Sequence, residues 1–245
     1  MEIYLTKIIL NPRSNRVRSE VGNPQELHRT ISRAFPPIEN PPDAKHHVRK
    51  TPRNQYNILY RLDIDRHRGK AFLLVQSEHK PDWSFLETDY SDELETKNVG
   101  ENYEAIESGM NLIFRLQANP TKRIGKSDQK ADDKFKPAGS KNIRRRVELR
   151  TDEERTDWLV RQGERLGFQI ANLQIEPAVR NVMSAKEEKI SFTKKGKNNP
   201  ITYGSVVFEG VLQVTDADKF RESMVNGIGQ GKAYGFGLLS VAPAK

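Results

Sequence analysis

Apolar residues recur along the chain in two similar series of predicted strands and helices. In the first series, IYLTKIIL (residues 3–10), QYNILYRLDI (55–64) and KAFLLVQS (70–77) have the branched and aromatic content of strands. One helix is expected between the first two strands, and a short helix is expected to start near Asp82. With a weak last strand before residue 110, the order β-α-β-β-α-β predicts a ferredoxin-like unit.

The first helix has clear signals at both of its ends. Asn23 suits the N-cap and Pro24 the first helical position, while the prolines at 36 and 37 end the segment. The polar residues 11–22 before it are expected to form a loop. The spacing predicts one buried stripe, made of Leu27, Ile31, Ala34 and Phe35.

The second half repeats the order. A capping box of Thr151 and Glu154 predicts one helix, over residues 151–167, and Asp216 caps another, over residues 216–226. Strands are predicted for MNLIFRLQAN (110–119), FQIANLQI (168–175), KISFTK (189–194), VVFEGVLQVTD (206–216) and FGLLSVA (236–242).

These patterns predict an α+β protein with two ferredoxin-like domains in tandem. The N-terminal domain is expected over residues 1–95 and the C-terminal domain over residues 110–245. The polar, acidic segment 92–109 lacks periodicity and is expected to connect them. Residues 121–142 are poor in apolar side chains and read as a flexible insertion.

Charge gives the first indication of a partner. The chain has 41 basic and 33 acidic residues, and residues 120–150 alone hold eleven Lys and Arg against four Asp and Glu. With no amphipathic membrane helix evident, this basic segment favours nucleic acid over a membrane, although a solvated loop would look the same. The chain has no cysteine, which excludes disulfides and is compatible with the cytoplasm.

The glycine-rich stretch NGIGQGKAYGFGLLS, from Asn226, is a candidate binding loop. A P-loop would need glycine at 226 and Ser or Thr at 233, where the chain has asparagine and alanine. The glycines also follow a helix rather than a strand, which excludes the dinucleotide fingerprint. A tight turn would explain one or two glycines, but five favour RNA contact through Gly229, Gly231, Lys232 and Tyr234.

Metal binding has little support in the sequence. Asp63, Asp65 and His67 lie where a strand runs into a turn, and a solvated turn is the favoured interpretation. His46 and His47 are adjacent, so they would point to opposite faces of a strand. We therefore expect no metal and no cofactor.

Six segments of the chain match one family: YLTKIILNPRS, ELHRTISRAFP, FRLQANPTKR, RRRVELRT, VVFEGVLQV and GIGQGKAYGFGLLSVAP. Through these segments the chain resembles the CasE endoribonucleases of type I-E CRISPR systems. The resemblance implies two ferredoxin-like domains that cut the hairpin repeat of precursor CRISPR RNA without a metal. It also implies that the protein stays bound as a subunit of the Cascade surveillance complex.

The resemblance gives His28 its role. Periodicity alone makes His28 a helix-edge histidine, whereas the family match implies that it is catalytic. Arg29 and Arg33 share one helix face and could bind phosphate, or they could be solvated or pair with Glu26. In similar proteins a tyrosine stands three residues before the histidine, but here Gln25 does, and glutamine is neither an acid nor a base.

The basic segment is expected to bind the RNA hairpin. Lys122 and Arg123 are candidates, and alternation along RRRVELR places Arg144 and Arg146 on one strand face, with Arg145 on the other. Two alternatives stay open: an RNA-hairpin-binding subunit without catalysis, and a nucleotide-binding enzyme that uses the glycine loop.

Overall fold

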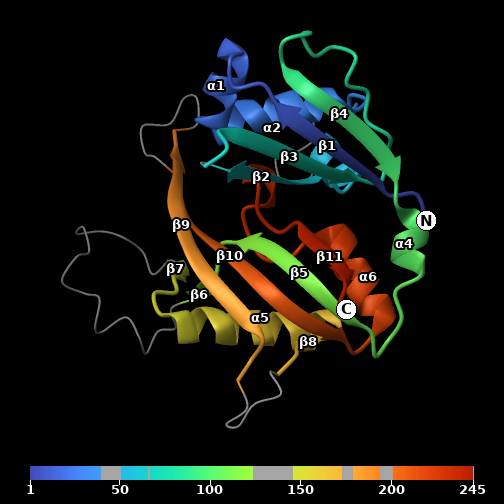
Figure 1. Cartoon of the computed structure of the whole chain (residues 1–245), viewed down its shortest axis with the longest axis vertical. Coiled ribbons are helices and arrows are strands. Elements are labelled where there is room, and N and C mark those ends of the chain that lie inside the picture. The colour runs from blue at the N-terminus through green and yellow to red at the C-terminus, as the bar shows by residue number, and fades with distance from the viewer. Residues whose placement is uncertain (40–50, 66, 124–145, 173–178, 194–200, 245) are drawn as a thin grey trace, which may run out of the picture.

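The two series of strands form two separate antiparallel sheets (Figure 1). The structure is a computed structural model and describes residues 1–39, 51–65, 67–123, 146–172, 179–193 and 201–244. The strand orders are β2-β3-β1-β4 in the N-terminal sheet and β11-β5-β10-β8 in the C-terminal sheet, where β9 also pairs with β10. Both orders are those of a ferredoxin-like fold, so the predicted fold class is confirmed.

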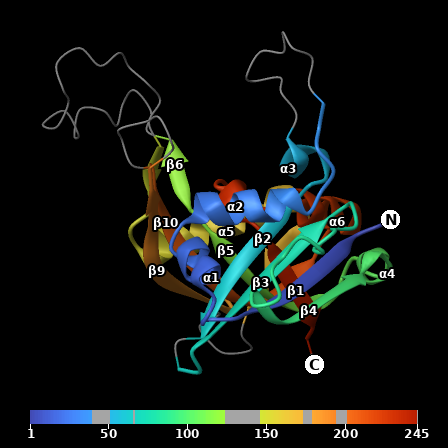
Figure 2. The same cartoon turned by 90° about the horizontal axis from the view of Figure 1, so that it is seen from above.

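The N-terminal sheet buries one face under two helices (Figure 2). Leu27 and Ile31 of α2 pack against Ile8 of β1 and against Leu73 and Val75 of β3. The predicted stripe on this helix is therefore buried as expected. The elements of this half are β1 (Tyr4–Leu10), α1 (Asn15–Val21), α2 (Pro24–Arg33), α3 (Pro52–Gln55), β2 (Leu59–Asp65), β3 (Lys70–Ser77) and β4 (Ser91–Asn98).

Polar contacts explain why α1 was not predicted. Residues 11–22 were expected to form a loop, but Asn15–Val21 is helical. Glu20 of α1 is buried and accepts hydrogen bonds from Arg16 Nε at 2.9 Å, from Thr30 Oγ1 at 2.6 Å and from the Tyr90 hydroxyl at 2.7 Å. Val17 and Val21 also reach the core, but two apolar positions and a buried carboxylate in so short a helix give no clear periodic signal.

Two further expectations for the first half are wrong. No helix starts near Asp82: residues 82–90 form turns, and Trp83 and Tyr90 anchor this segment in the core. The segment 92–109 is not a bare connection: it begins with β4, which pairs with β1 from Ser91 to Asn98 and is the weak last strand expected before residue 110. β4 is an edge strand with mostly exposed side chains, so it lacks the apolar alternation of a half-buried strand. The domain limits at residues 95 and 110 stay predictions.

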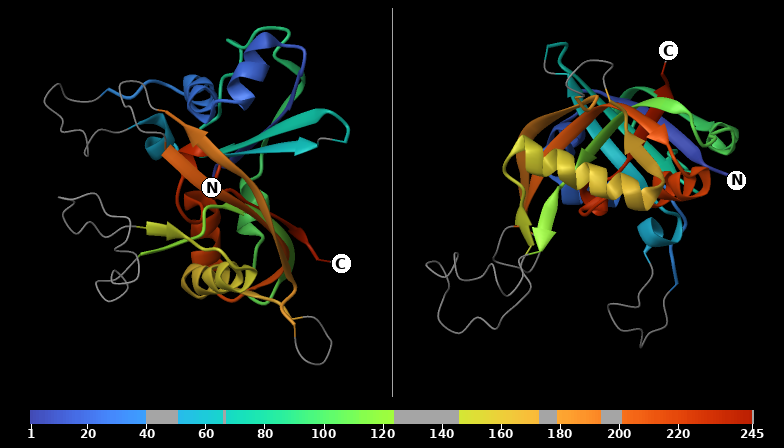
Figure 3. Two further views of the ribbon diagram at one scale, coloured as in Figure 1. Left: turned by 90° about the vertical axis from the view of Figure 1, so that its left-hand side faces the viewer. Right: turned by 90° about the horizontal axis from the view of Figure 1, so that it is seen from below.

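The C-terminal sheet is covered on one face by two helices (Figure 3). Trp158 and Leu159 of α5 and Phe220 of α6 pack against Phe114 and Phe208 of the sheet. The elements are α4 (Gly100–Glu104), β5 (Asn111–Ala118), β6 (Thr121–Arg123), β7 (Arg146–Glu148), α5 (Asp152–Leu166), β8 (Phe168–Ile170), β9 (Val182–Phe192), β10 (Ile201–Val214), α6 (Ala217–Asn226), the 3-10 helix η3 (Lys232–Tyr234) and β11 (Leu239–Pro243).

The helix starts of this half agree with the sequence. Thr151 and Glu154 form the predicted capping box, and the Asp216 side chain accepts a hydrogen bond from Lys219 N. The predicted insertion at 121–142 opens with β6, which pairs with β7; its other residues lie outside the described ranges. None of the helices in these ranges has both the length and the apolar composition needed to cross a bilayer.

Candidate functional site

Helix α2 presents His28 at its edge. The Asn23 side chain accepts a hydrogen bond from Gln25 N at 3.2 Å, and this cap fixes where the helix starts. Leu27 and Ile31 are buried in the core, so His28, next to Leu27, is only half-buried. The imidazole therefore lies at the boundary between the core and the surface.

His28 meets a segment from the other end of the chain. Its ring centroid lies 6.3 Å from that of Tyr234 in η3. The Tyr234 ring in turn packs on Phe192 of β9 at 4.5 Å and on Tyr203 of β10 at 5.5 Å. We call this meeting of α2, η3 and the β9–β10 pair the α2–η3 junction. It places one titratable imidazole beside a phenol and further aromatic rings.

Tyr60 of β2 ties the two sides of this junction together. Its hydroxyl donates to Ala233 O at 3.0 Å and lies 3.4 Å from Pro24 O, so one group contacts both η3 and α2. Burial, with a smaller effect of Tyr234, raises the pKa of Tyr60 far above its ordinary value. The hydroxyl therefore stays a hydrogen-bond donor at any physiological pH.

We expect the Tyr60→Phe substitution to lower the free energy of unfolding by about 1–2 kcal/mol, because two backbone carbonyls lose their shared donor. Urea denaturation measures this loss. Tyr56→Phe is the matched control: the Tyr56 ring packs on Phe35 and His79, and its hydroxyl has no hydrogen bond among the described residues. Equal losses in the two variants would contradict a tying role for the Tyr60 hydroxyl.

The glycine-rich loop has structural reasons for its glycines. Residues 227, 229, 231, 235 and 237 all have positive φ. A Cβ on Gly231 would lie 2.8 Å from the Phe236 ring, and one on Gly229 would lie 3.3 Å from Trp158. Backbone conformation and close packing thus require glycine at these two positions. RNA contact through Gly229 and Gly231 stays a prediction.

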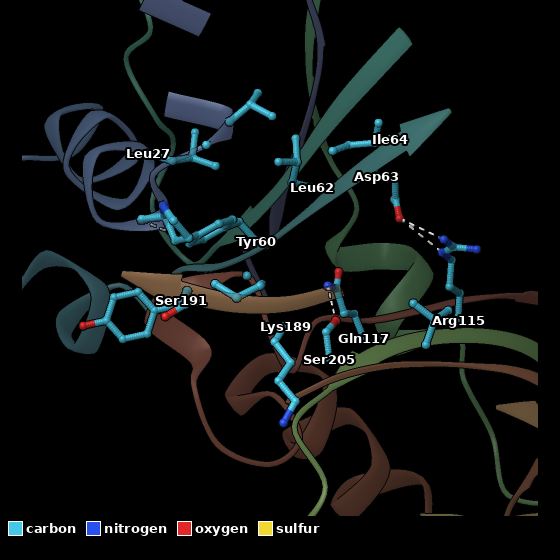
Figure 4. Close-up of a pocket in the computed structure, with 17 residues that line it drawn as sticks. Leu27, Tyr60, Leu62, Asp63, Ile64, Arg115, Gln117, Lys189, Ser191 and Ser205 are labelled. Carbon is cyan, nitrogen blue, oxygen red and sulfur yellow. Dashed lines mark hydrogen bonds and ion pairs between the residues drawn. The ribbon is translucent and has the colours of Figure 1, made fainter. Parts of the chain in front are cut away.

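A cleft of about 340 Å³ separates the two halves beside the junction. Figure 4 shows Leu27 and Tyr60 on one wall, and Gln117 and Ser205 on the other. Gln117 Nε2 donates to Ser205 Oγ at 2.9 Å. Tyr234 also lines the cleft, so the cleft opens next to the ring that contacts His28.

Asp63 in this cleft corrects one expectation. It was assigned to a solvated turn, but its carboxylate pairs with Arg61 at 2.8 Å and with Arg115 at 3.1 Å. Arg61 is buried and also donates to Ser240 Oγ at 2.9 Å, so the cluster joins β2 to the C-terminal sheet. Asp65 is the last residue of β2, and its side chain accepts a hydrogen bond from Arg68 N in the turn that follows. In the described part of the chain, no group of three His, Asp or Glu side chains is arranged to hold a metal.

A basic groove of about 500 Å³ lies between β7 and β9. Among the lining side chains that the structure describes, Glu148 alone is a carboxylate; it pairs with Lys189 at 2.8 Å, and the described cations outnumber it. On the neighbouring strand β6, Arg123 stands directly opposite Arg146. Like charges placed opposite each other repel, and a bound anion would relieve that repulsion. The cations that line the groove are Arg146, Arg150, Lys186 and Lys189.

Comparisons with known proteins assign the chain to a family. A family model described as CRISPR associated protein matches residues 3–243. The chain belongs to this CRISPR-associated family. It is 32% identical to the CRISPR-associated endoribonuclease Cse3 of Thermus thermophilus, over 98% of this chain and all of the relative. It is 29% identical to the CRISPR system Cascade subunit CasE of Escherichia coli K12, with the same coverage. The predicted membership of the CasE family is confirmed.

The fold comparison agrees. The structure of Thermus thermophilus Cse3 bound to an RNA representing a pre-cleavage complex matches with a TM-score of 0.74 and 31% identity. The match covers 99% of this chain and all of the other. The likeness therefore extends over both sheets of this CRISPR-associated chain.

The predicted RNA-binding residues of this CRISPR-associated chain fall at two places. Lys232 and Tyr234 lie at the α2–η3 junction, whereas Lys122, Arg123 and Arg146 lie on β6 and β7. Lys122 pairs with Glu154 at 2.9 Å, so part of its charge is already neutralised. The structure does not test Arg144, which lies outside the described residues, as do Arg145, His46 and His47.

The two arginines of α2 both have partners within the protein. Arg29 pairs with Glu26, which was one of the two readings left open for it. The Arg33 guanidinium lies over the Phe85 ring, 4.5 Å from its centroid. Both side chains are exposed, so phosphate contact stays a prediction for each.

Some residues near the basic groove and the α2–η3 junction were not predicted. Lys186 and Lys189 belong to β9, whose first half was not recognised as a strand, and Arg150 lies just beyond the residues chosen in RRRVELR. The stretch KEEK, residues 186–189, holds two lysines and two glutamates, so no net charge in the sequence singles out its lysines. Tyr60 appeared only as an apolar strand residue.

Proposed function

We propose that the chain is a metal-independent endoribonuclease that binds the hairpin repeat of precursor CRISPR RNA and cuts it. The observation that carries the proposal is the position of His28, half-buried beside Tyr234 at the edge of the interdomain cleft. The relative named an endoribonuclease and the neighbour bound to a pre-cleavage RNA support it.

The proposed chemistry uses only groups of the RNA and the protein. The 2′-hydroxyl loses its proton and attacks the adjacent phosphorus, and the bond to the 5′-oxygen breaks. The 5′-oxygen takes up a proton, which leaves a 2′,3′-cyclic phosphate and a free 5′-hydroxyl. His28 transfers a proton in at least one of these steps, a role typically worth ~10²- to 10⁴-fold in rate. Gln25 cannot take the other proton-transfer role, so the chain either uses His28 twice or recruits another group.

The hairpin is proposed to be bound by electrostatic attraction. The basic groove and the Arg123–Arg146 pair provide cations on one surface of the C-terminal half. An A-form stem presents its phosphates to such a surface and is recognised by shape and charge. We propose the same phosphate-binding role for Arg144, from its place in the sequence, and for Lys122 beside Arg123. Near the scissile bond, the proposed contacts are Arg29, Arg33, Gly229, Gly231, Lys232 and Tyr234.

After cleavage, the chain is proposed to keep the mature guide RNA and act as a Cascade subunit in the cytoplasm. The name of the Escherichia coli relative, a Cascade subunit, supports this assignment. The runner-up function is a hairpin-binding subunit without catalysis, which Gln25 favours because one proton-transfer group is missing.

One assay separates the two functions. We expect repeat hairpin RNA to be cut in the presence of EDTA, with a 2′,3′-cyclic phosphate on the 5′ fragment. A single 2′-deoxy nucleotide at the cleavage position should abolish cutting while leaving binding unchanged, because it removes the nucleophile. Radiolabelled RNA and end analysis measure both results. Tight binding without any product would support the binding subunit, and a deoxy RNA that is still cut would exclude the proposed chemistry.

A further inference from the structure

Two basic residues, Arg53 and Lys232, belong to segments that meet where β2 starts and α6 ends. Arg53 O accepts a hydrogen bond from Ile58 N at 3.0 Å, and the next residue, Leu59, packs against Gly227. Lys232 Nζ donates to Asn226 O, the carbonyl just before that glycine, at 2.7 Å. The short helix α3 thus brings Arg53 to the same corner as Lys232 of η3.

The charges at this corner are not balanced. Both side chains are half-buried, and burial lowers the pKa of each; the charge of Arg53 lowers that of Lys232 further. Among the described residues, neither side chain forms an ion pair with a carboxylate. Four other arginines with well-covered side chains all do: Arg16, Arg61, Arg155 and Arg221.

Lys232 alone would have a simple structural explanation. An ammonium group that bonds a carbonyl at the C-terminus of α6 is favoured by the helix dipole. That explanation does not extend to Arg53, whose guanidinium has no hydrogen-bond acceptor among the described residues. A desolvated cation beside a second cation is energetically unfavourable, unless an anion from outside the chain binds between the two.

The corner lies close to the proposed reaction centre. Lys232 and Tyr234 are two residues apart in η3, and the Tyr234 ring contacts His28. An arginine presents two parallel donors to phosphate oxygens, while a lysine adds a mobile point charge. We propose that Arg53 and Lys232 together bind one phosphate group of the RNA strand, near the bond that His28 cuts. This inference rests on the proposed function.

Salt-dependent binding of repeat hairpin RNA tests the site. Arg53→Gln should weaken binding about tenfold at moderate salt and make the slope of log K against log salt shallower by roughly 0.7, the value for one lost phosphate contact on a single strand. Arg68→Gln is the charge-matched control, since the Arg68 side chain is 79% exposed and its one ion pair within the described ranges is with Asp65. Arg53→Lys should keep the wild-type slope with reduced affinity, which also shows that the position tolerates substitution.

A second measurement locates the phosphate. Neutral methylphosphonates are placed one at a time around the cleavage position. In the wild type and in Arg68→Gln, one position should weaken binding clearly; in Arg53→Gln, that same position should have no further effect.

The possible outcomes are distinct. If the wild type binds and cuts the hairpin but Arg53→Gln behaves like Arg68→Gln in both measurements, the phosphate site is rejected and the proposed function stands. If the wild type neither binds nor cuts, the proposed function fails and the inference fails with it.

Discussion

Replacing His28 with alanine should lower the rate of hairpin cleavage by ~10²- to 10⁴-fold, while the affinity for the hairpin changes little. The imidazole lies at the edge of α2, and the buried stripe of that helix does not depend on it. Its loss should therefore remove proton transfer without disturbing the fold. Single-turnover cleavage and equilibrium binding of the same labelled RNA measure the two effects separately.

His67→Ala is the matched control for this experiment. His67 is exposed in the turn between β2 and β3, so its removal should change neither rate nor affinity. If His28→Ala cuts at the rate of the wild type, His28 has no part in the chemistry. If the variant loses binding and cleavage together, the imidazole belongs to the binding surface instead.

The second large effect is expected on stability, at Glu20. Replacing Glu20 with alanine should lower the free energy of unfolding by about 3–5 kcal/mol, because it leaves the Arg16 cation without its buried partner. The hydroxyls of Thr30 and Tyr90 lose the same acceptor. Burial and the Glu20 carboxylate both raise the pKa of Tyr90, so this hydroxyl is a permanent donor. Urea denaturation measures the change.

Glu87→Ala provides the comparison. Glu87 also pairs with Arg16, at 3.3 Å, but its side chain is 63% exposed, so its removal should cost no more than about 1 kcal/mol. Similar losses in the two variants would mean that the buried network around Glu20 contributes little. A large loss at Glu20 alone would show that a carboxylate fixes α1 against the helix that carries His28.

The parts of the fold that could be predicted are those held by apolar stripes. Leu27 and Ile31 indicated α2, and the capping box at Thr151 indicated α5. The parts that could not be predicted depend on polar contacts or on an edge position. Helix α1 is fixed through Glu20. Strand β4 was expected only as a weak strand without bounds, because it exposes charged residues such as Glu93 at the edge of its sheet.

The candidate site also has parts that the sequence indicated and parts that it did not. His28 followed from the resemblance, since its spacing on α2 alone made it an ordinary helix-edge residue. Its neighbour Tyr234 was chosen for its place in a glycine-rich loop, but their contact joins opposite ends of the chain and leaves no local pattern. Tyr60 and Arg53 were missed for that reason: their significance comes from partners that only the tertiary fold brings near.

The α2–η3 junction also has a consequence for how the protein is made. Its two halves are α2, from the first helices of the chain, and η3, which is synthesised after every described strand except β11. While the polypeptide is still emerging from the ribosome, the amino-terminal half can form its own sheet but cannot bring Tyr234 beside His28. Until η3 has left the ribosome, the proposed cleavage site therefore lacks the aromatic neighbour of its histidine.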